Sequence, residues 1–359
     1  LIISGARTVN SVTLANGGTI GIAGSFTTSA TFSSGSYIIT NNTIDFNSTG
    51  AQSIGIFNYY NLTISGARTT ANVTLPSGTI GIANTFTPAA TFTSGTYSKV
   101  STNIIDFNGT GAQTVPAFDY MYLKISGTRT TNNVTLVNGG TIGVAGATNA
   151  ISLTATFTSG TYVNTNNTIN FNSSSAQNVT IPAAGFINNL AFNCAGTASL
   201  VNAITTANVT GNVSVQTGTF SNNGFAIAGN ASKAFSVSDG AYFIVNKATS
   251  MPTGFGTNTL GTSSTVDFNG PNSQTVGAFN YGNLTISGTR ANQTVTLVNG
   301  GTIGIAGTFS TTASFTVGGY IITNNTIDFN GSGLQTIPAF NYNNLTSSST
   351  GARILVNGG

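Results

Sequence analysis

Hydrophobic and polar residues alternate along most of this chain in short runs. Segments such as 43–46 (Thr-Ile-Asp-Phe) and 212–215 (Asn-Val-Ser-Val) place every second side chain on the same face, which is the period of a half-buried β-strand. No stretch with a period of 3.6 residues is long enough for a helix. The pattern predicts an all-β protein made of many short strands, with Gly and Asn in the turns between them.

The same strand sequences return at a fixed spacing. The interval from Asp45 to Asp106 equals the interval from Asp267 to Asp328, and it defines a 61-residue repeat. Within one such unit, new strand-like runs begin near Asn72, Thr91, Ala112 and Asn133. These steps favour three coils of about 20 residues in each repeat, and two coils of about 30 residues are the alternative.

A solenoid accommodates a unit of this length better than the common β-architectures do. An immunoglobulin-type sandwich needs about 100 residues, and the sequence signatures of propeller blades are missing. We therefore predict a right-handed parallel β-solenoid that runs continuously over residues 1–359. Its repeats are expected at about 7–67, 68–128, 129–192 and 290–352, with a diverged stretch at 193–289.

Two sets of phenylalanines recur at equivalent positions, and both are expected in the interior. The first set is Phe46, Phe107, Phe171, Phe268 and Phe329. The second set is Phe57, Phe118, Phe279 and Phe340. Full burial of one phenylalanine contributes about 1.5–3 kcal/mol, so these stacks would dominate the stability of the solenoid.

Charge is scarce, which excludes several function classes. Only 4% of residues are charged, the net charge is +3, and no cluster of Lys and Arg is present, so nucleic acid is not expected as a partner. No apolar run reaches the ~18 residues of a membrane span. The single cysteine, Cys194, is expected to be a small buried hydrophobic residue.

Aspartate and arginine recur in pairs that are about one coil apart. The pairs are Asp45 with Arg68, Asp106 with Arg129, Asp267 with Arg290, and Asp328 with Arg353. In the third repeat Asn170 replaces the aspartate and the arginine position falls near Gly196, so both charges are lost together. We expect an Asp–Arg bridge between adjacent coils. The alternative is a charged stripe that binds an acidic polymer or carries out catalysis.

The residues of an enzyme are not evident in this sequence. There is no His and no Glu, and one Cys cannot form a cluster of metal ligands. Aspartates three coils apart would be about 14 Å from one another, which exceeds the separation of paired catalytic carboxylates. We expect no catalysis, cofactor or metal, and a β-helical polysaccharide lyase is the most remote alternative.

A row of tyrosines is the candidate ligand face: Tyr59, Tyr120, Tyr281 and Tyr342. Such a ladder would suit a polysaccharide chain, and the other interpretation is a half-buried wall of the solenoid. Thr-x-Thr runs such as residues 91–93 suggest an ice-binding surface. That function needs a regular Thr array in every coil, which the sequence does not keep.

Several longer motifs resemble a known family. They are 229–235 (Gly-Asn-Ala-Ser-Lys-Ala-Phe), the segment from Met251 to Leu260, 264–270 (Ser-Thr-Val-Asp-Phe-Asn-Gly) and the segment from Tyr281 to Gly288. They are similar to the repeats of very large secreted surface proteins of Bacteroidetes and related bacteria. The resemblance implies an adhesin-like parallel β-helix, often exported by the type IX pathway, and it supplies no catalytic residues.

These observations predict a non-catalytic extracellular protein that forms a surface fibre, a sheath or an adhesin stalk. Residues 1–7 and 351–359 match strands from within a repeat, so other copies of the chain are the expected partners, joined end to end or laterally. Surface polysaccharide is the alternative partner.

Overall fold

The computed structural model describes residues 1–183, 185–246 and 250–356, and within these residues it is all-β, with parallel strands and no helix. The predicted parallel β-solenoid is confirmed. No helix in the described part of the chain is long and apolar enough to cross a membrane. The right-handed winding stays a prediction.

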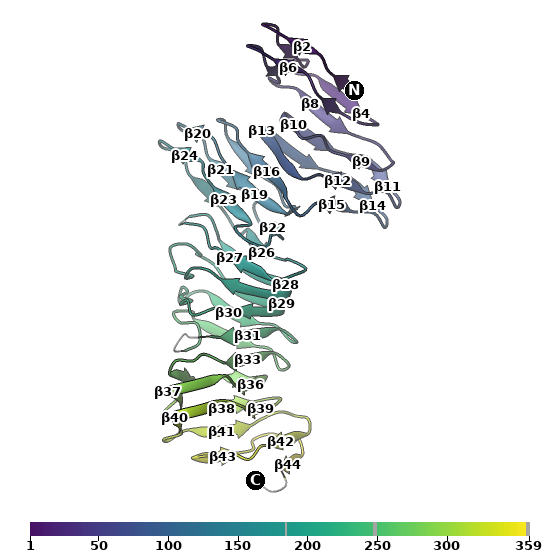
Figure 1. Cartoon of the computed structure of the whole chain (residues 1–359). Helices are drawn as coiled ribbons and strands as arrows, with labels where there is room; N and C mark the ends of the chain where they lie inside the picture. The colour runs from purple at the N-terminus through teal and green to yellow at the C-terminus, as the bar shows by residue number, and fades with distance from the viewer. Residues whose placement is uncertain (184, 247–249, 357–359) are drawn as a thin grey trace. The chain divides into compact units, whose positions relative to one another are not determined.

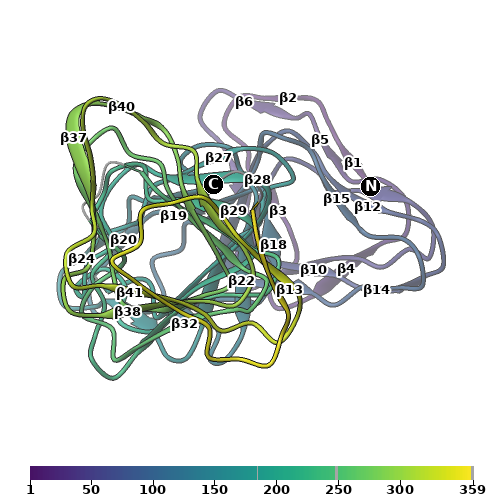
Figure 2. The same cartoon turned by 90° about the horizontal axis from the view of Figure 1, so that it is seen from below.

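The chain divides into two compact units, Leu1–Asn167 (unit 1) and Thr168–Gly359 (unit 2). Each unit is a stack of parallel turns, and Figure 1 shows the strands of unit 2 following one another from β26 to β43. Seen from below, the turns of unit 2 superimpose around a shared interior (Figure 2). The continuity of one solenoid over 1–359 and the repeat boundaries stay predictions.

One face of unit 1 is a seven-stranded parallel sheet, which we call the spine of that unit. Its strands in spatial order are β4 (Thr19–Ile22), β8 (Thr43–Phe46), β10 (Asn58–Ile64), β13 (Gly78–Pro88), β16 (Asn103–Phe107), β19 (Tyr122–Ile125) and β23 (Ile151–Leu153). The remaining strands of unit 1 form short lateral stacks of two or three turns. These stacks are β1 (Ile2–Ile3) with β5 (Thr27–Thr28); β2 (Ala6–Arg7) with β6 (Thr31–Phe32); β3 (Val12–Thr13) with β7 (Tyr37–Ile38); β9 (Gln52–Ser53), β12 (Val73–Leu75) and β15 (Tyr97–Lys99); β11 (Ala67–Arg68) with β14 (Thr91–Phe92); β17 (Gln113–Val115), β21 (Val134–Leu136) and β25 (Tyr162–Asn164); and β20 (Thr128–Arg129) with β24 (Thr156–Phe157). Apart from these stacks, β18 (Asp119–Tyr120) pairs with β22 (Thr141–Val144).

Unit 2 has the same organisation. Its main sheet contains β26 (Thr168–Phe171), β27 (Gln177–Val179), β28 (Asn189–Leu200), β29 (Val213–Ser221), β30 (Ala234–Val237), β31 (Tyr242–Val245), β32 (Thr257–Leu260), β33 (Thr265–Phe268), β36 (Asn283–Ile286) and β39 (Phe309–Thr311). Its lateral stacks are β34 (Gln274–Val276), β37 (Thr289–Leu297) and β40 (Ser314–Ile321); β35 (Asn280–Tyr281), β38 (Thr302–Ile305), β41 (Thr326–Phe329) and β43 (Asn344–Thr346); and β42 (Gln335–Ile337) with β44 (Arg353–Leu355).

The turns are unequal in length. Gly21 pairs with Asp45, and Asp45 in turn pairs with Thr63, so the second of these turns is clearly shorter than the first. The same short offset follows the other three repeated aspartates, in the pairs Asp106–Lys124, Asp267–Thr285 and Asp328–Thr346. We call the shorter turns narrow and the longer turns wide. A narrow turn begins at each of these aspartates, whereas the sequence predicted coils of even length. The 61-residue repeat as a structural unit stays a prediction.

The lateral stacks stop where a wide turn meets the next narrow turn, and we call each such place a step. β14 and β15, for example, pair with the preceding turn alone. Aromatic rings bridge this step in place of a hydrogen-bond ladder: the Phe118 ring lies 5.0 Å from that of Tyr97 and 5.3 Å from that of Phe86. The same arrangement joins Phe340 to Tyr320 at 5.0 Å and to Phe309 at 5.4 Å. These edge-to-face contacts hold the adjacent turns together at the Phe118 and Phe340 steps.

The two phenylalanine sets therefore differ in burial. The first set lies in the interior as predicted, and all five of its side chains are at most 1% exposed. The prediction for the second set was wrong, because its rings, at Phe57, Phe118, Phe279 and Phe340, are only half-buried. Each of these rings lies at a step, where the narrow turn does not cover the wide turn completely.

Candidate functional site

Three of the four recurring arginines lie inside the solenoid, and the fourth, Arg353, is half-buried. Arg68, Arg129 and Arg290 are 2%, 0% and 0% exposed, and they are among the largest fully buried side chains. They lie on β11, β20 and β37, where strand alternation directs their side chains inward. A buried cation is costly unless its donors are satisfied, so its partners decide what this site does.

Each of these guanidinium groups binds a buried glutamine. Arg68 Nη2 donates to Gln52 Oε1 at 2.8 Å, and Arg290 Nη2 donates to Gln274 Oε1 at 2.6 Å. Arg129 makes the same bond to Gln113. The other donors reach backbone carbonyls: Arg68 Nη1 donates to Ser65 O at 2.6 Å and its Nε donates to Gly50 O at 3.2 Å.

The glutamine extends this link to the preceding turn. Gln52 Nε2 donates to Ile22 O at 2.6 Å and to Gly24 O at 3.1 Å, while its Oε1 also accepts from Ser48 N. One amide thus connects the wide turn before it, its own narrow turn and the arginine of the turn after it. The carbonyls that it binds lie where the wide and narrow turns diverge. The Arg–Gln pair therefore supplies hydrogen bonds where the ladder between the turns is interrupted.

An aromatic ring from the following turn covers the arginine on its other side. Arg129 Cζ lies 5.9 Å from the centre of the Phe157 ring, and Arg290 Cζ lies 5.8 Å from that of Phe315. A cation over an aromatic face is attracted by the ring quadrupole. The buried charge is therefore held between an amide and a ring.

The predicted direct Asp–Arg bridges do not form. Ser65 Oγ donates to Asp45 at 2.8 Å, while the Ser65 carbonyl accepts from Arg68, so a serine separates the two charges. Strand alternation is the reason: Phe46 points inward, so its neighbour Asp45 points outward, away from the buried arginine.

The other three pairs differ from the prediction in the same way. Ser126 separates Asp106 from Arg129, and Ser287 separates Asp267 from Arg290. Asp328 accepts from Ser348, while Arg353 donates to Phe329 O. Within the described residues the ion pair of an aspartate is instead Asp106 with Lys124, at 3.0 Å.

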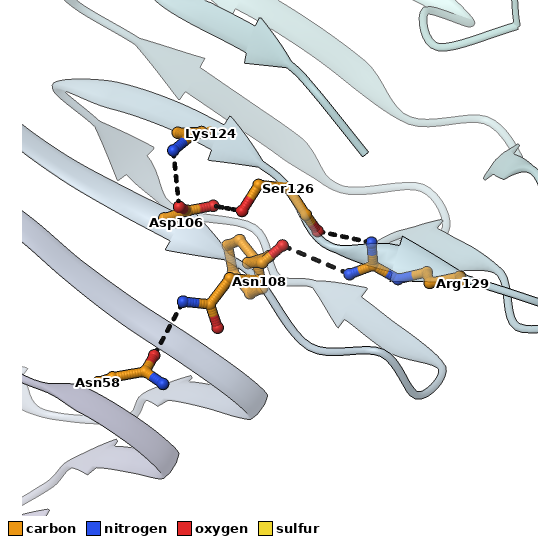
Figure 3. A network of polar contacts seen from close by, with 7 residues as sticks. Asn58, Asp106, Asn108, Lys124, Ser126 and Arg129 are labelled. Atoms are coloured by element: carbon orange, nitrogen blue, oxygen red, sulfur yellow. Dashed lines mark hydrogen bonds and ion pairs between the residues drawn. The ribbon is translucent and has the colours of Figure 1, made fainter. Parts of the chain in front are cut away.

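Figure 3 shows this network in unit 1, where Asp106 lies between Lys124 and Ser126 and the chain of contacts ends at Arg129. Nearby, Asn108 Nδ2 donates to Asn58 Oδ1 at 2.8 Å, two turns away. Gly81 lies between these two amides, and a Cβ atom there would clash with both. The glycine is therefore required for the amide bridge, and Asn330, Asn280 and Gly304 repeat this arrangement in unit 2.

Cys194, at the start of the diverged stretch that follows the third repeat, takes the place of the arginine. The single S–H of Cys194 is within hydrogen-bond distance of two acceptors, Gln177 Oε1 at 3.1 Å and Phe171 O at 3.3 Å. These atoms are equivalent to the two that Arg68 Nη2 binds. Burial raises the pKa of this thiol, which keeps it neutral. The equivalent position is thus Cys194 and not the neighbourhood of Gly196. Since the aspartate of this repeat is Asn170, both charges are absent together.

The candidate ligand face of tyrosines was wrong. Tyr59, Tyr120 and Tyr281 are 0% exposed, and their hydroxyls donate to the carbonyls of Gly55, Pro116 and Gly277. Tyr342 is half-buried and donates to Pro338 O. The first three phenols fill the interior and cannot reach a ligand, so the four tyrosines do not form one ligand face.

Burial also sets the protonation of these groups. It raises the pKa of Tyr59, Tyr120 and Tyr281 far above the usual range, and it raises the pKa of Tyr342 to about 12. Burial lowers the pKa of the Arg68 guanidinium, while the charges of Tyr97 and Asp45 oppose that effect. The pKa of Asp267 is raised by burial and lowered again by hydrogen bonds from Ser287 and Tyr242.

The interpretation of the sequence missed the glutamines. Gln52, Gln113 and Gln274 each precede an arginine by the same offset of 16 positions, and this constant offset was a signal as regular as that of the aspartates.

Within the described residues no group of three His, Cys, Asp or Glu side chains is placed to hold a metal ion. No family model, curated protein or solved structure gives a significant match to this chain.

The charges of Asp106 and Arg129 should be coupled through Ser126, which contacts both. Arg129→Cys should lower the free energy of unfolding by about 1–3 kcal/mol, because buried acceptors lose a charged donor. Combined with Asp106→Asn it reproduces the natural Asn170 and Cys194 pair. The double variant should therefore lose less than the sum of the two single variants, by about 0.5–3 kcal/mol in denaturant titrations.

In a control double-mutant cycle, Lys124→Met replaces Arg129→Cys and is combined with the same Asp106→Asn. Lys124 is half-exposed and contacts the same carboxylate. Lys124→Met alone should lower the free energy of unfolding by no more than about 1 kcal/mol. Strict additivity of Asp106→Asn and Arg129→Cys would show that the two charges are independent.

The buried tyrosines should make the fold less stable at alkaline pH. The folded-state pKa of Tyr120 lies above its unfolded value of 10.0, so its contribution to stability is fully present below pH 10 and is lost as pH rises. For each buried phenol, the free energy of unfolding should fall by about 1.4 kcal/mol for every pH unit above the unfolded pKa. The melting temperature should fall steeply with pH across this range, and the fall should be shallower in Tyr120→Phe. An identical slope in the two proteins would contradict the raised pKa of Tyr120.

Proposed function

We propose that this chain is a non-catalytic structural or adhesive segment of an extracellular surface protein. The observation that carries the proposal is that the residues with the most distinctive chemistry are engaged in holding turns together. In each repeat with an Arg–Gln pair, the guanidinium and the amide bind one another and backbone carbonyls. A protein whose recurring polar residues serve its own scaffold is suited to bear load or present a surface.

The solenoid supports this proposal in a second way. Each turn buries its apolar side chains against its neighbours alone, so turns can be added or diverge without disturbing the others. Unit 2 shows this tolerance, because Cys194 replaces an arginine while the glutamine contact is kept. Resemblance to repeat-rich surface adhesins, extracellular location and association with other copies belong to the same proposal.

Limited proteolysis tests the scaffold role. Arg68, Arg129 and Arg290 are buried, so trypsin should not cleave after them in the native chain, whereas the chain unfolded in denaturant should be cut at all three. The fragments can be identified by mass spectrometry. Rapid native cleavage at these arginines would contradict a scaffold built to persist outside the cell.

A parallel assay separates a scaffold from an enzyme. Incubation with soluble neutral and acidic polysaccharides should release no reducing ends and no unsaturated products. Release that persists after repurification would show that the chain is a catalyst and would overturn the proposal.

A further inference from the structure

Two similar grooves open on unit 2. The first has a volume of about 590 Å³ and the second about 570 Å³, within the range of small-molecule sites. Ala278, Phe279 and Asn280 line the first groove, and the same three residue types, one repeat later, line the second. The grooves are therefore two copies of one feature.

Both grooves lie at steps between turns. β32, which forms one lip of the first groove, pairs with β30 alone, and β39, which ends at the second groove, pairs with β36 alone. Within the described residues no strand continues the sheet past these edges. The step that leaves Phe279 and Phe340 half-buried thus also creates the space beside each ring.

The lining combines an aromatic ring with neutral hydrogen-bonding groups. Thr259, Asn280 and Thr302 present exposed side chains around the first groove, and Asn341 does so beside Phe340 in the second. None of the residues that line either groove is charged. An anionic ligand would find no cation there to compensate its desolvation.

We propose that these grooves bind a neutral polysaccharide. A sugar ring has a face of C–H groups and a rim of hydroxyls, which match a phenyl ring flanked by amide and hydroxyl side chains. Two equivalent grooves on one unit allow a single chain to engage both, which increases avidity. This inference deepens the proposed adhesive function and rests on it, and it replaces the buried tyrosines with Phe279 and Phe340 as the contact residues.

The test is a glycan array bearing neutral and acidic oligosaccharides, probed with the whole chain of 359 residues. We expect saturable binding to neutral glycans that added NaCl does not weaken. The double variant Phe279→Ala with Phe340→Ala should lose about tenfold or more in affinity, whereas Phe279→Trp should keep it. Phe32→Ala is the matched control, since Phe32 is also half-buried but lies in unit 1 outside both grooves.

If the double alanine variant fails to fold, Thr259→Ala with Asn341→Ala gives the same test, because both side chains are exposed. Binding to acidic glycans alone, no saturable binding, or an equal loss in Phe32→Ala would overturn the inference. Capture of an extended peptide in place of a glycan would do the same. A chain that resists trypsin but binds no glycan would overturn this inference and leave the scaffold role intact.

Discussion

A buried guanidinium that no carboxylate touches stabilises each narrow turn that carries it. An isolated charge is costly in an apolar interior, and here carbonyls, a glutamine amide and an aromatic ring from three turns compensate for that cost. The bonds of one side chain thus join turns that the backbone ladder leaves apart. Where Cys194 replaces the arginine, a neutral thiol keeps the glutamine contact and removes the need to bury a charge.

The unequal turns accompany the buried arginines and determine the outer surface. A narrow turn cannot cover the wide turn beside it, so the lateral sheets end and aromatic rings fill the gap. In unit 2 this incomplete cover leaves the two neutral grooves beside Phe279 and Phe340. The features that hold the fold and those proposed to bind a ligand therefore arise at the same steps.

Much of the fold could be predicted from the sequence, since alternation and a fixed spacing are local signals. Phe46 lies inward as its strand pattern indicates. Phe57 is half-buried because its neighbours come from turns of different width, which no local pattern records. The Asp45 and Arg68 spacing correctly predicted adjacent turns, but the strand alternation that turns Phe46 inward turns Asp45 outward, away from the buried arginine. Gln52 carries no charge, so charge pairing alone did not indicate it, although its offset from Arg68 is equally regular.

The most direct test is NMR of the arginine side chains in the native protein labelled with ¹⁵N-arginine. Our account predicts separate, slowly exchanging Nη–H signals for Arg68, Arg129 and Arg290, because each guanidinium is buried and bound to a glutamine carbonyl oxygen. The signal of Arg129 should disappear in Arg129→Cys, which assigns it. Guanidinium signals that are all averaged and exchange rapidly, as in an exposed arginine, would contradict the buried network.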